Sequence, residues 1–131
     1  MFLEDDLDFN VHLRHNLETW EPLVSGAITL AGLYNPNIAA RSQGERLFIA
    51  DPDAIYGSQA FLLSRECIRF ILDHWEEAGG AQDLKFSRLA SLLNRPIYYH
   101  LPSLVEHVGT TSTWGGAVHC AVDFDRYFRA G

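Results

Sequence analysis

Apolar residues recur with helical spacing in three segments of the chain. The first predicts a helix over about 11–21, with Asn10 as its N-cap, from Leu13, Leu17 and Trp20. In the second, Ser64 can cap a helix that Gly79-Gly80 ends, and the apolar positions are Ile68, Ile71, Leu72 and Trp75. In the third, Asp83 is the expected cap, Arg95-Pro96 ends the helix, and one face carries Phe86, Leu89, Ala90 and Leu93.

Short apolar runs bounded by Asn, Pro and Gly predict strands between these helices. They cover 27–34, 46–50, 59–63 (a strand or a turn), 97–99 and 105–108. The start, Met1-Phe2-Leu3, has the pattern of a buried strand that leads into an acidic loop. Because strands alternate with helices, we expect an α/β fold with a mixed sheet. A length of 131 residues fits one domain over 1–131.

Composition and charge narrow the class of protein. The chain is 47% hydrophobic and 21% charged, which favours a globular fold over a disordered chain. Its net charge of -7 argues against a dedicated nucleic-acid binder, which would present a basic face. The longest uncharged run, 22–40, contains Asn35-Pro36-Asn37 and is not a membrane span. Carboxylates at 4–6 leave no room for a signal peptide, so a cytoplasmic protein is expected.

Two cysteines, Cys67 and Cys120, lie far apart and have no CxxC spacing. This spacing favours two separate thiols over a disulfide or a thiolate metal framework.

The acidic triplet Glu4-Asp5-Asp6 is the first candidate for chemistry. Clustered carboxylates at the end of an apolar strand are costly unless a positive charge neutralises them. Mg²⁺ and Mn²⁺ prefer such hard oxygen ligands, so the triplet predicts a divalent metal site. The alternative is a solvated acidic loop.

Three further positions each carry a functional and a structural interpretation. In Gly57-Ser58-Gln59 the glycine lets backbone approach a ligand and the small residues leave room for a sugar ring; the alternative is a turn. Asp83 is either a general base that faces a cleft or an N-cap. His107 is either a ligand or a hydrogen-bonded core residue. Weaker candidates are the aromatic Trp114 and the histidines His12, His15, His74, His100 and His119.

The order of these segments, rather than any one of them, points to a family. They are Phe2 to Asp6, Tyr56 to Arg65, Gly80 to Asp83 and Pro102 to Gly109. Together they resemble the second half of nucleotide-sugar-dependent glycosyltransferases with the GT-A fold. The likeness is greatest to bacterial glycosyltransferases and to the Golgi branching N-acetylglucosaminyltransferases. It runs from Phe2 to about Asp125.

The resemblance implies a role for each position. It makes Asp6 a ligand of Mn²⁺ or Mg²⁺, with Glu4 and Asp5 nearby, although the triplet is not a strict Asp-x-Asp. It makes Asp83 the base of an inverting transfer, and His107, or else His119, the residue that completes the metal shell. Gly57, Ser58, Gln59 and Trp114 would contact substrate, which is a nucleoside diphosphate sugar and a hydroxyl acceptor.

The same resemblance implies that the half of the fold that binds the nucleotide is missing. We therefore expect a fragment that associates with that half or with a second copy through Met1-Phe2-Leu3 and the strand at 27–33. A non-catalytic α/β binding module is the alternative function. If Asp6 and His107 hold one ion, they must converge in space.

Overall fold

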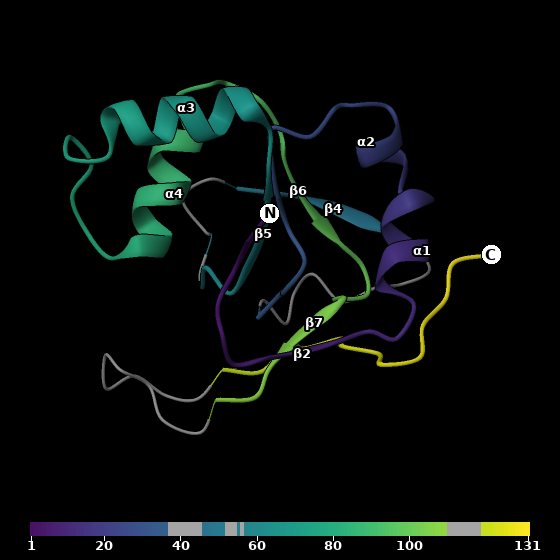
Figure 1. Cartoon of the computed structure of the whole chain (residues 1–131). Coiled ribbons are helices and arrows are strands. Elements are labelled where there is room, and N and C mark those ends of the chain that lie inside the picture. The colour runs from purple at the N-terminus through teal and green to yellow at the C-terminus, as the bar shows by residue number, and fades with distance from the viewer. Residues whose placement is uncertain (37–45, 52–54, 56, 110–118) are drawn as a thin grey trace.

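A computed structural model describes residues 1–36, 46–51, 55, 57–109 and 119–131 as a mixed α/β fold (Figure 1). Its main sheet has five strands in the order β1-β5-β3-β6-β4. Their bounds are Phe2–Leu3 (β1), Leu30–Gly32 (β3), Leu47–Ala50 (β4), Ala60–Leu63 (β5) and Ile97–His100 (β6). β3 pairs with β6 in parallel and the other pairs are antiparallel, so the mixed sheet expected from the sequence is confirmed.

A separate two-stranded ribbon joins the beginning of the chain to its last third. β2 (Leu7–Phe9) runs antiparallel to β7 (Val105–His107), with Leu7 opposite His107. The sequence did not predict β2, because the Leu-Asp-Phe segment is only three residues long and gives almost no alternation.

Both faces of the main sheet are buried, and successive residues alternate between them. Leu30 and Phe61 face a core cluster that includes residues of α3 (Arg65–His74) and α4 (Gln82–Ser91). Figure 1 shows these two helices packed together at one side of the sheet. Ala31 and Leu62 face a second cluster, formed with residues of the β2–β7 ribbon and of α1 (Leu13–Glu18). The period of two thus places β3 and β5 between two layers.

The helix expected over 11–21 is instead two short helices, α1 and α2 (Glu21–Val24). The break falls at Trp20, whose backbone is extended, and Pro22 then lies in the first turn of α2, where proline is tolerated. Asn10 is not the N-cap, which is His12. The Asn10 side chain is buried and accepts hydrogen bonds from the His12 backbone N–H and from the Asn16 side chain.

Helix α3 begins where the sequence predicts, because the Ser64 hydroxyl accepts a hydrogen bond from the Cys67 backbone N–H at 3.1 Å. Its buried face differs from the prediction. Cys67 and Ile71 are buried, whereas Ile68 and Leu72 are exposed. The helix also ends at His74, before Gly79-Gly80. Both cysteines are free thiols, as expected, with Cys67 buried and Cys120 exposed.

Helix α4 buries Phe86, Leu89 and Ala90 as predicted, but its N-cap is Ala81, and Asp83 is not the cap. The Asp83 carboxylate accepts hydrogen bonds from the Leu84 backbone N–H in α4 at 2.8 Å and from the Gly57 backbone N–H at 3.1 Å.

The two segments expected at an uncovered edge have different environments. β1 is an edge strand, where Met1 and Leu3 are exposed, so the prediction of a buried strand there is wrong. The prediction of an uncovered strand at 27–33 is also wrong. β3 lies between β5 and β6 with all three of its residues buried. Of the helices described, none is long and apolar enough to cross a bilayer.

Candidate metal centre

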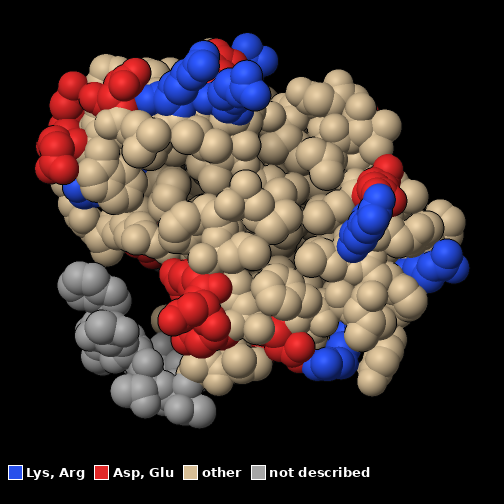
Figure 2. Space-filling view, in the orientation of Figure 1, with Lys and Arg blue, Asp and Glu red and all other residues tan. Residues whose placement is uncertain are grey.

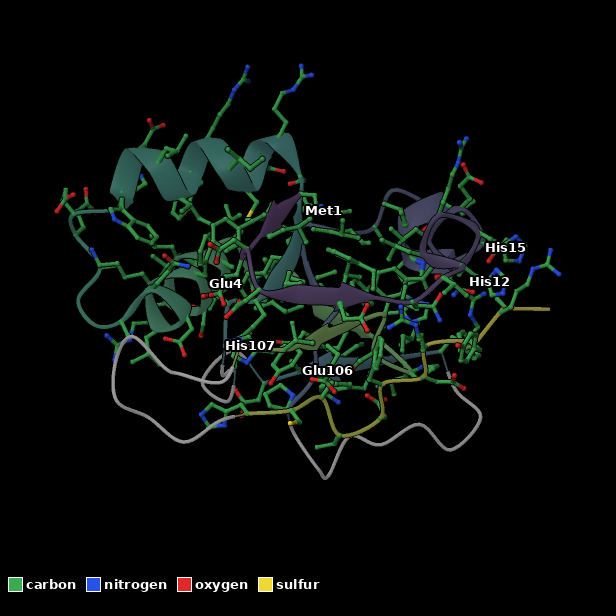
Figure 3. All side chains as sticks on the ribbon, turned by 60° about the horizontal axis from the view of Figure 1, so that its bottom comes forward. Met1, Glu4, His12, His15, Glu106 and His107 are labelled. Atoms are coloured by element: carbon green, nitrogen blue, oxygen red, sulfur yellow. The ribbon has the colours of Figure 1, made fainter. Side chains whose placement is uncertain are left out.

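Glu4, Asp6 and His107 converge on one side of the molecule, as Figure 3 shows for Glu4 and His107. One ligand atom from each lies within 4.8 Å of the other two. His107 Nε2 and Asp6 Oδ2 are 2.9 Å apart, although the residues are separated by 101 positions. The expectation that Asp6 and His107 meet in space is therefore met.

Backbone pairing holds the two carboxylate residues in place. The Glu4 N–H donates to the Gln59 carbonyl at 3.0 Å, which continues the β1–β5 pairing by one residue. The Asp6 carbonyl accepts from the Val108 N–H at 3.0 Å, which continues the β2–β7 ribbon. The segment between β1 and β2 therefore passes from the main sheet to the ribbon and carries its carboxylates between them.

Gly109 leaves the room that these side chains occupy. A Cβ at this position would overlap Asp6 Oδ2 and would lie 2.7 Å from His107 Nε2. Any other residue would displace the atoms that form the candidate ligand set. The sequence placed Gly109 in a motif but gave no reason for a glycine there.

The charges at this site are unbalanced. Acidic side chains gather over the segment between β1 and β2 (Figure 2), and no described Lys or Arg forms an ion pair with Glu4, Asp5 or Asp6. Asp5 is exposed, whereas the side chains of Asp6 and His107 are 39% and 15% exposed. Two carboxylates and one imidazole, partly withdrawn from water and without a basic neighbour, fit a divalent cation such as Mn²⁺ or Mg²⁺.

A two-residue turn joins this ligand set to the start of α4. The Ser58 hydroxyl donates to Glu4 Oε1 at 3.1 Å, and the Gln82 amide donates to the Ser58 oxygen at 3.0 Å. The neighbouring Gly57, which has a positive φ of 78°, gives its N–H to the Asp83 carboxylate. Of the predicted residues, Ser58 therefore contacts a candidate ligand directly, and Asp83 is linked to it through Gly57, the residue next to Ser58.

Tyr34 is a nearby residue that the sequence did not single out. Its hydroxyl is buried and has no hydrogen-bond partner within the described part of the chain. Burial raises the pKa of this phenol strongly, and the charges of Glu106, Cys120 and Glu4 add to the effect. Tyr34 therefore stays neutral and keeps a proton to donate. In the sequence Tyr34 ends a run of apolar residues, and nothing in that pattern predicts a buried hydroxyl near the candidate ligands.

The other candidates are not part of the convergent group. Gln59 Oε1 is buried without a partner, next to Gly57. His119 is exposed, and Trp114 lies outside the described residues. His12 and His15 lie at the opposite end of the molecule, near α1 (Figure 3). His74 is bonded to Glu77, and His100 is fully buried.

Comparisons of the chain with protein-family models, with curated proteins and with solved structures found no match. The geometry of the site therefore carries the functional argument.

Proposed function

We propose that this chain is a metal-dependent glycosyltransferase of GT-A type, or the catalytic half of one. It would move a sugar from a nucleoside diphosphate sugar to a hydroxyl acceptor. One observation carries the proposal: Glu4, Asp6 and His107 converge, and a single turn connects them to Asp83.

Each residue takes the role that the family resemblance implies. Asp6, Glu4 and His107 would hold Mn²⁺ or Mg²⁺ with two oxygens and one nitrogen. When bound, the cation would neutralise the negative charge of the diphosphate leaving group. Asp83 would accept the proton of the acceptor hydroxyl while that oxygen bonds to the anomeric carbon and the bond from this carbon to the diphosphate oxygen breaks.

The Asp83 carboxylate has two backbone contacts. Oδ1 accepts the Leu84 N–H in the first turn of α4 at 2.8 Å, and Oδ2 accepts the Gly57 N–H at 3.1 Å. The second contact, which a helix cap would not make, supports the assignment, because Gly57 adjoins Ser58, whose hydroxyl bonds Glu4. The residue directly before Asp83, Gln82, reaches Ser58.

The proposal is tested first by Mn²⁺ binding, measured by titration calorimetry on the wild-type chain, Asp6→Asn and His107→Gln. We expect the wild type to bind and both variants to lose at least about 100-fold in affinity, since changes in residues behind a ligand already cost about 10- to 100-fold. Asp123→Asn, which removes a charge that bonds Ser103, is the matched control and should bind like the wild type.

Sugar transfer is then measured with a panel of nucleoside diphosphate sugars and hydroxyl acceptors. Transfer that requires Mn²⁺ and is lost in Asp6→Asn supports the full proposal. Mn²⁺ binding without transfer or donor binding supports the non-catalytic module instead. A wild-type chain that binds neither Mn²⁺ nor Mg²⁺ overturns the metal site and the proposal that depends on it.

A further inference from the structure

The Ser58 hydroxyl has the geometry of a support for Glu4. Ser58 is only 6% exposed. Its Oγ lies 3.1 Å from Glu4 Oε1 and 3.0 Å from Gln82 Nε2, so the three side chains form one hydrogen-bonded chain from α4 to the ligand set.

The direction of this chain follows from chemistry. An ionised carboxylate only accepts hydrogen bonds, so the single hydrogen of the Ser58 hydroxyl must go to Glu4. The Ser58 oxygen then has only lone pairs to offer, and Gln82 must turn its NH₂ group toward it. Gln82 in this orientation cannot take the hydrogen away from Glu4.

We propose that Ser58 is a positioning residue for the metal ligand Glu4, and that Gln82 fixes the direction in which Ser58 donates. This inference rests on the proposed metal site. It gives Ser58 a different role from the substrate contact that the family resemblance implies, because its only hydrogen is already used within the protein. The helix that carries Asp83 and the strand end that carries Glu4 are thereby joined through one side chain.

The backbone supports the same conclusion. Gln59, next to Ser58, accepts the Glu4 N–H, and Gly57, on the other side, donates to Asp83. The turn is held at both ends, so the Ser58 hydroxyl meets a carboxylate whose backbone is already fixed. A hydrogen bond between two fixed groups orients the carboxylate, which otherwise rotates about its last bond.

The experiment is a double-mutant cycle on Mn²⁺ affinity, with the wild type, Ser58→Ala, Gln82→Leu and the double variant. We expect Ser58→Ala to weaken Mn²⁺ binding about 10-fold, which is the lower end of the range for a residue that supports a metal ligand. Gln82→Leu should weaken Mn²⁺ binding less, because Gln82 is exposed and water can replace its hydrogen bond to Ser58. In the Ser58→Ala background the Gln82 change should add nothing, because its effect passes through Ser58. Ser91→Ala is the matched control, since this hydroxyl in α4 donates to a backbone carbonyl away from the site.

Gln82→Glu gives a second test that leaves the buried Ser58 in place. Its carboxylate competes for the Ser58 hydrogen, so we expect weaker Mn²⁺ binding than in Gln82→Leu, although the added negative charge alone would strengthen it. If Gln82→Glu binds Mn²⁺ as tightly as the wild type, or more tightly, the proposal is overturned. This test remains valid if Ser58→Ala does not fold.

The outcomes separate this inference from the proposed function. A wild type that binds no Mn²⁺ overturns both. If the wild type and Ser58→Ala bind Mn²⁺ equally well, only the role of Ser58 is overturned and the proposed metal site is unaffected. Additive effects of Ser58→Ala and Gln82→Leu overturn the chain through Ser58.

Discussion

Two polar clusters of this molecule join distant parts of the chain, and they differ in how fully they are satisfied. The first is the amide cluster, Asn10 and Asn16, which are 2% and 0% exposed. Their side chains bond each other and hold the backbone of Asp125, Phe128 and Ala130 at the end of the chain. The second is the acid cluster, Glu4, Asp6 and His107.

The amide cluster is closed, because its donors and acceptors find partners inside the protein. The acid cluster is open: it places two negative charges together, and the buried His107 Nδ1 has no partner among the residues that the structure describes. A closed cluster stabilises the fold. An open cluster destabilises it until a ligand satisfies the groups that have no partner. Mutations in the amide cluster should therefore lower the stability of the fold, whereas mutations in the acid cluster should lower the affinity for Mn²⁺ and the rate of sugar transfer.

The largest effect is expected from Asp83→Asn, beside the acid cluster. Asparagine keeps the shape and the acceptor for the Gly57 N–H but cannot take a proton, so sugar transfer should fall by about 100- to 10,000-fold. Initial rates at saturating donor measure this. Asp73→Asn, at an exposed position of α3, is the control and should keep the parent rate. Transfer by Asp83→Asn at the parent rate would exclude the base.

In the amide cluster, Asn16→Ala should cost about 3 kcal/mol or more in the free energy of unfolding. It leaves the buried Ala130 N–H without a partner, which costs about 1–3 kcal/mol, and it removes the hydrogen bonds that Asn16 donates to Asn10 Oδ1 and to the Phe128 carbonyl, each worth about 1 kcal/mol. Urea denaturation measures the change. Arg14→Ala, which removes an exposed pair with Glu18, should leave the midpoint unchanged. If Asn16→Ala were as stable as the wild type but bound Mn²⁺ more weakly, the distinction between the amide cluster and the acid cluster would be wrong.

Acid should weaken the same end of the fold through His100. This ring packs on Trp20 and Phe128 and donates from Nδ1 to the Pro102 carbonyl, while the buried Nε2 has no partner in the ranges that the structure describes. Burial lowers the pKa of His100 from 6.5 to about 4, against the opposing effect of the Pro102 bond, and the charge of Arg46 lowers it further.

The unfolded chain thus takes up a proton near pH 6.5 while the folded chain does not. The contribution of His100 to stability is complete above pH 6.5 and is lost as the pH falls toward 4, by about 3 kcal/mol. Unfolding free energies between pH 7 and 4.5 should therefore fall less steeply in His100→Gln than in the wild type. Parallel slopes would contradict the assignment.

The smallest effect is expected from Gly109→Ala in the acid cluster. The new methyl group would overlap Asp6 Oδ2 and press on His107, so Mn²⁺ affinity should fall about 10-fold while the fold is retained. Gly79→Ala is the matched control, because a Cβ there meets nothing within 4 Å. Equal Mn²⁺ affinity of the two variants would show that Gly109 does not shape the site.

Local sequence signals predicted the parts of this fold that depend on local rules. Ser64 predicted the start of α3, and the spacing of Phe86, Leu89 and Ala90 predicted the buried face of α4. Ile68 and Leu72 have the same spacing yet are exposed, because the packing of α3 against the sheet and α4 selects Cys67 and Ile71 instead. Which stripe of a helix is buried depends on its neighbours, and spacing alone does not contain them.

The candidate site shows the same limit. Glu4, Asp6, Asp83 and His107 were singled out by residue type and by the order of motifs, which survive in a linear sequence. The hydrogen bonds that Ser58, Gln82 and Tyr34 make or lack depend on side-chain directions, and no pattern along the chain encodes them. Asp83 shows this within one residue: its type predicts a contact with the start of α4, which Leu84 provides, but not the contact with Gly57.

The strand connections that build the acid cluster also set when it can form. Glu4 meets Ser58 across 54 positions, and Asp6 meets His107 across 101. Contacts of such long range close late, because the entropy of a large loop must be lost before they are made. During synthesis Glu4 and Asp6 therefore cannot form this cluster until His107 has emerged. A cation that binds here would bind only the folded state. Its binding would therefore follow the last step of folding and would stabilise the folded state by mass action.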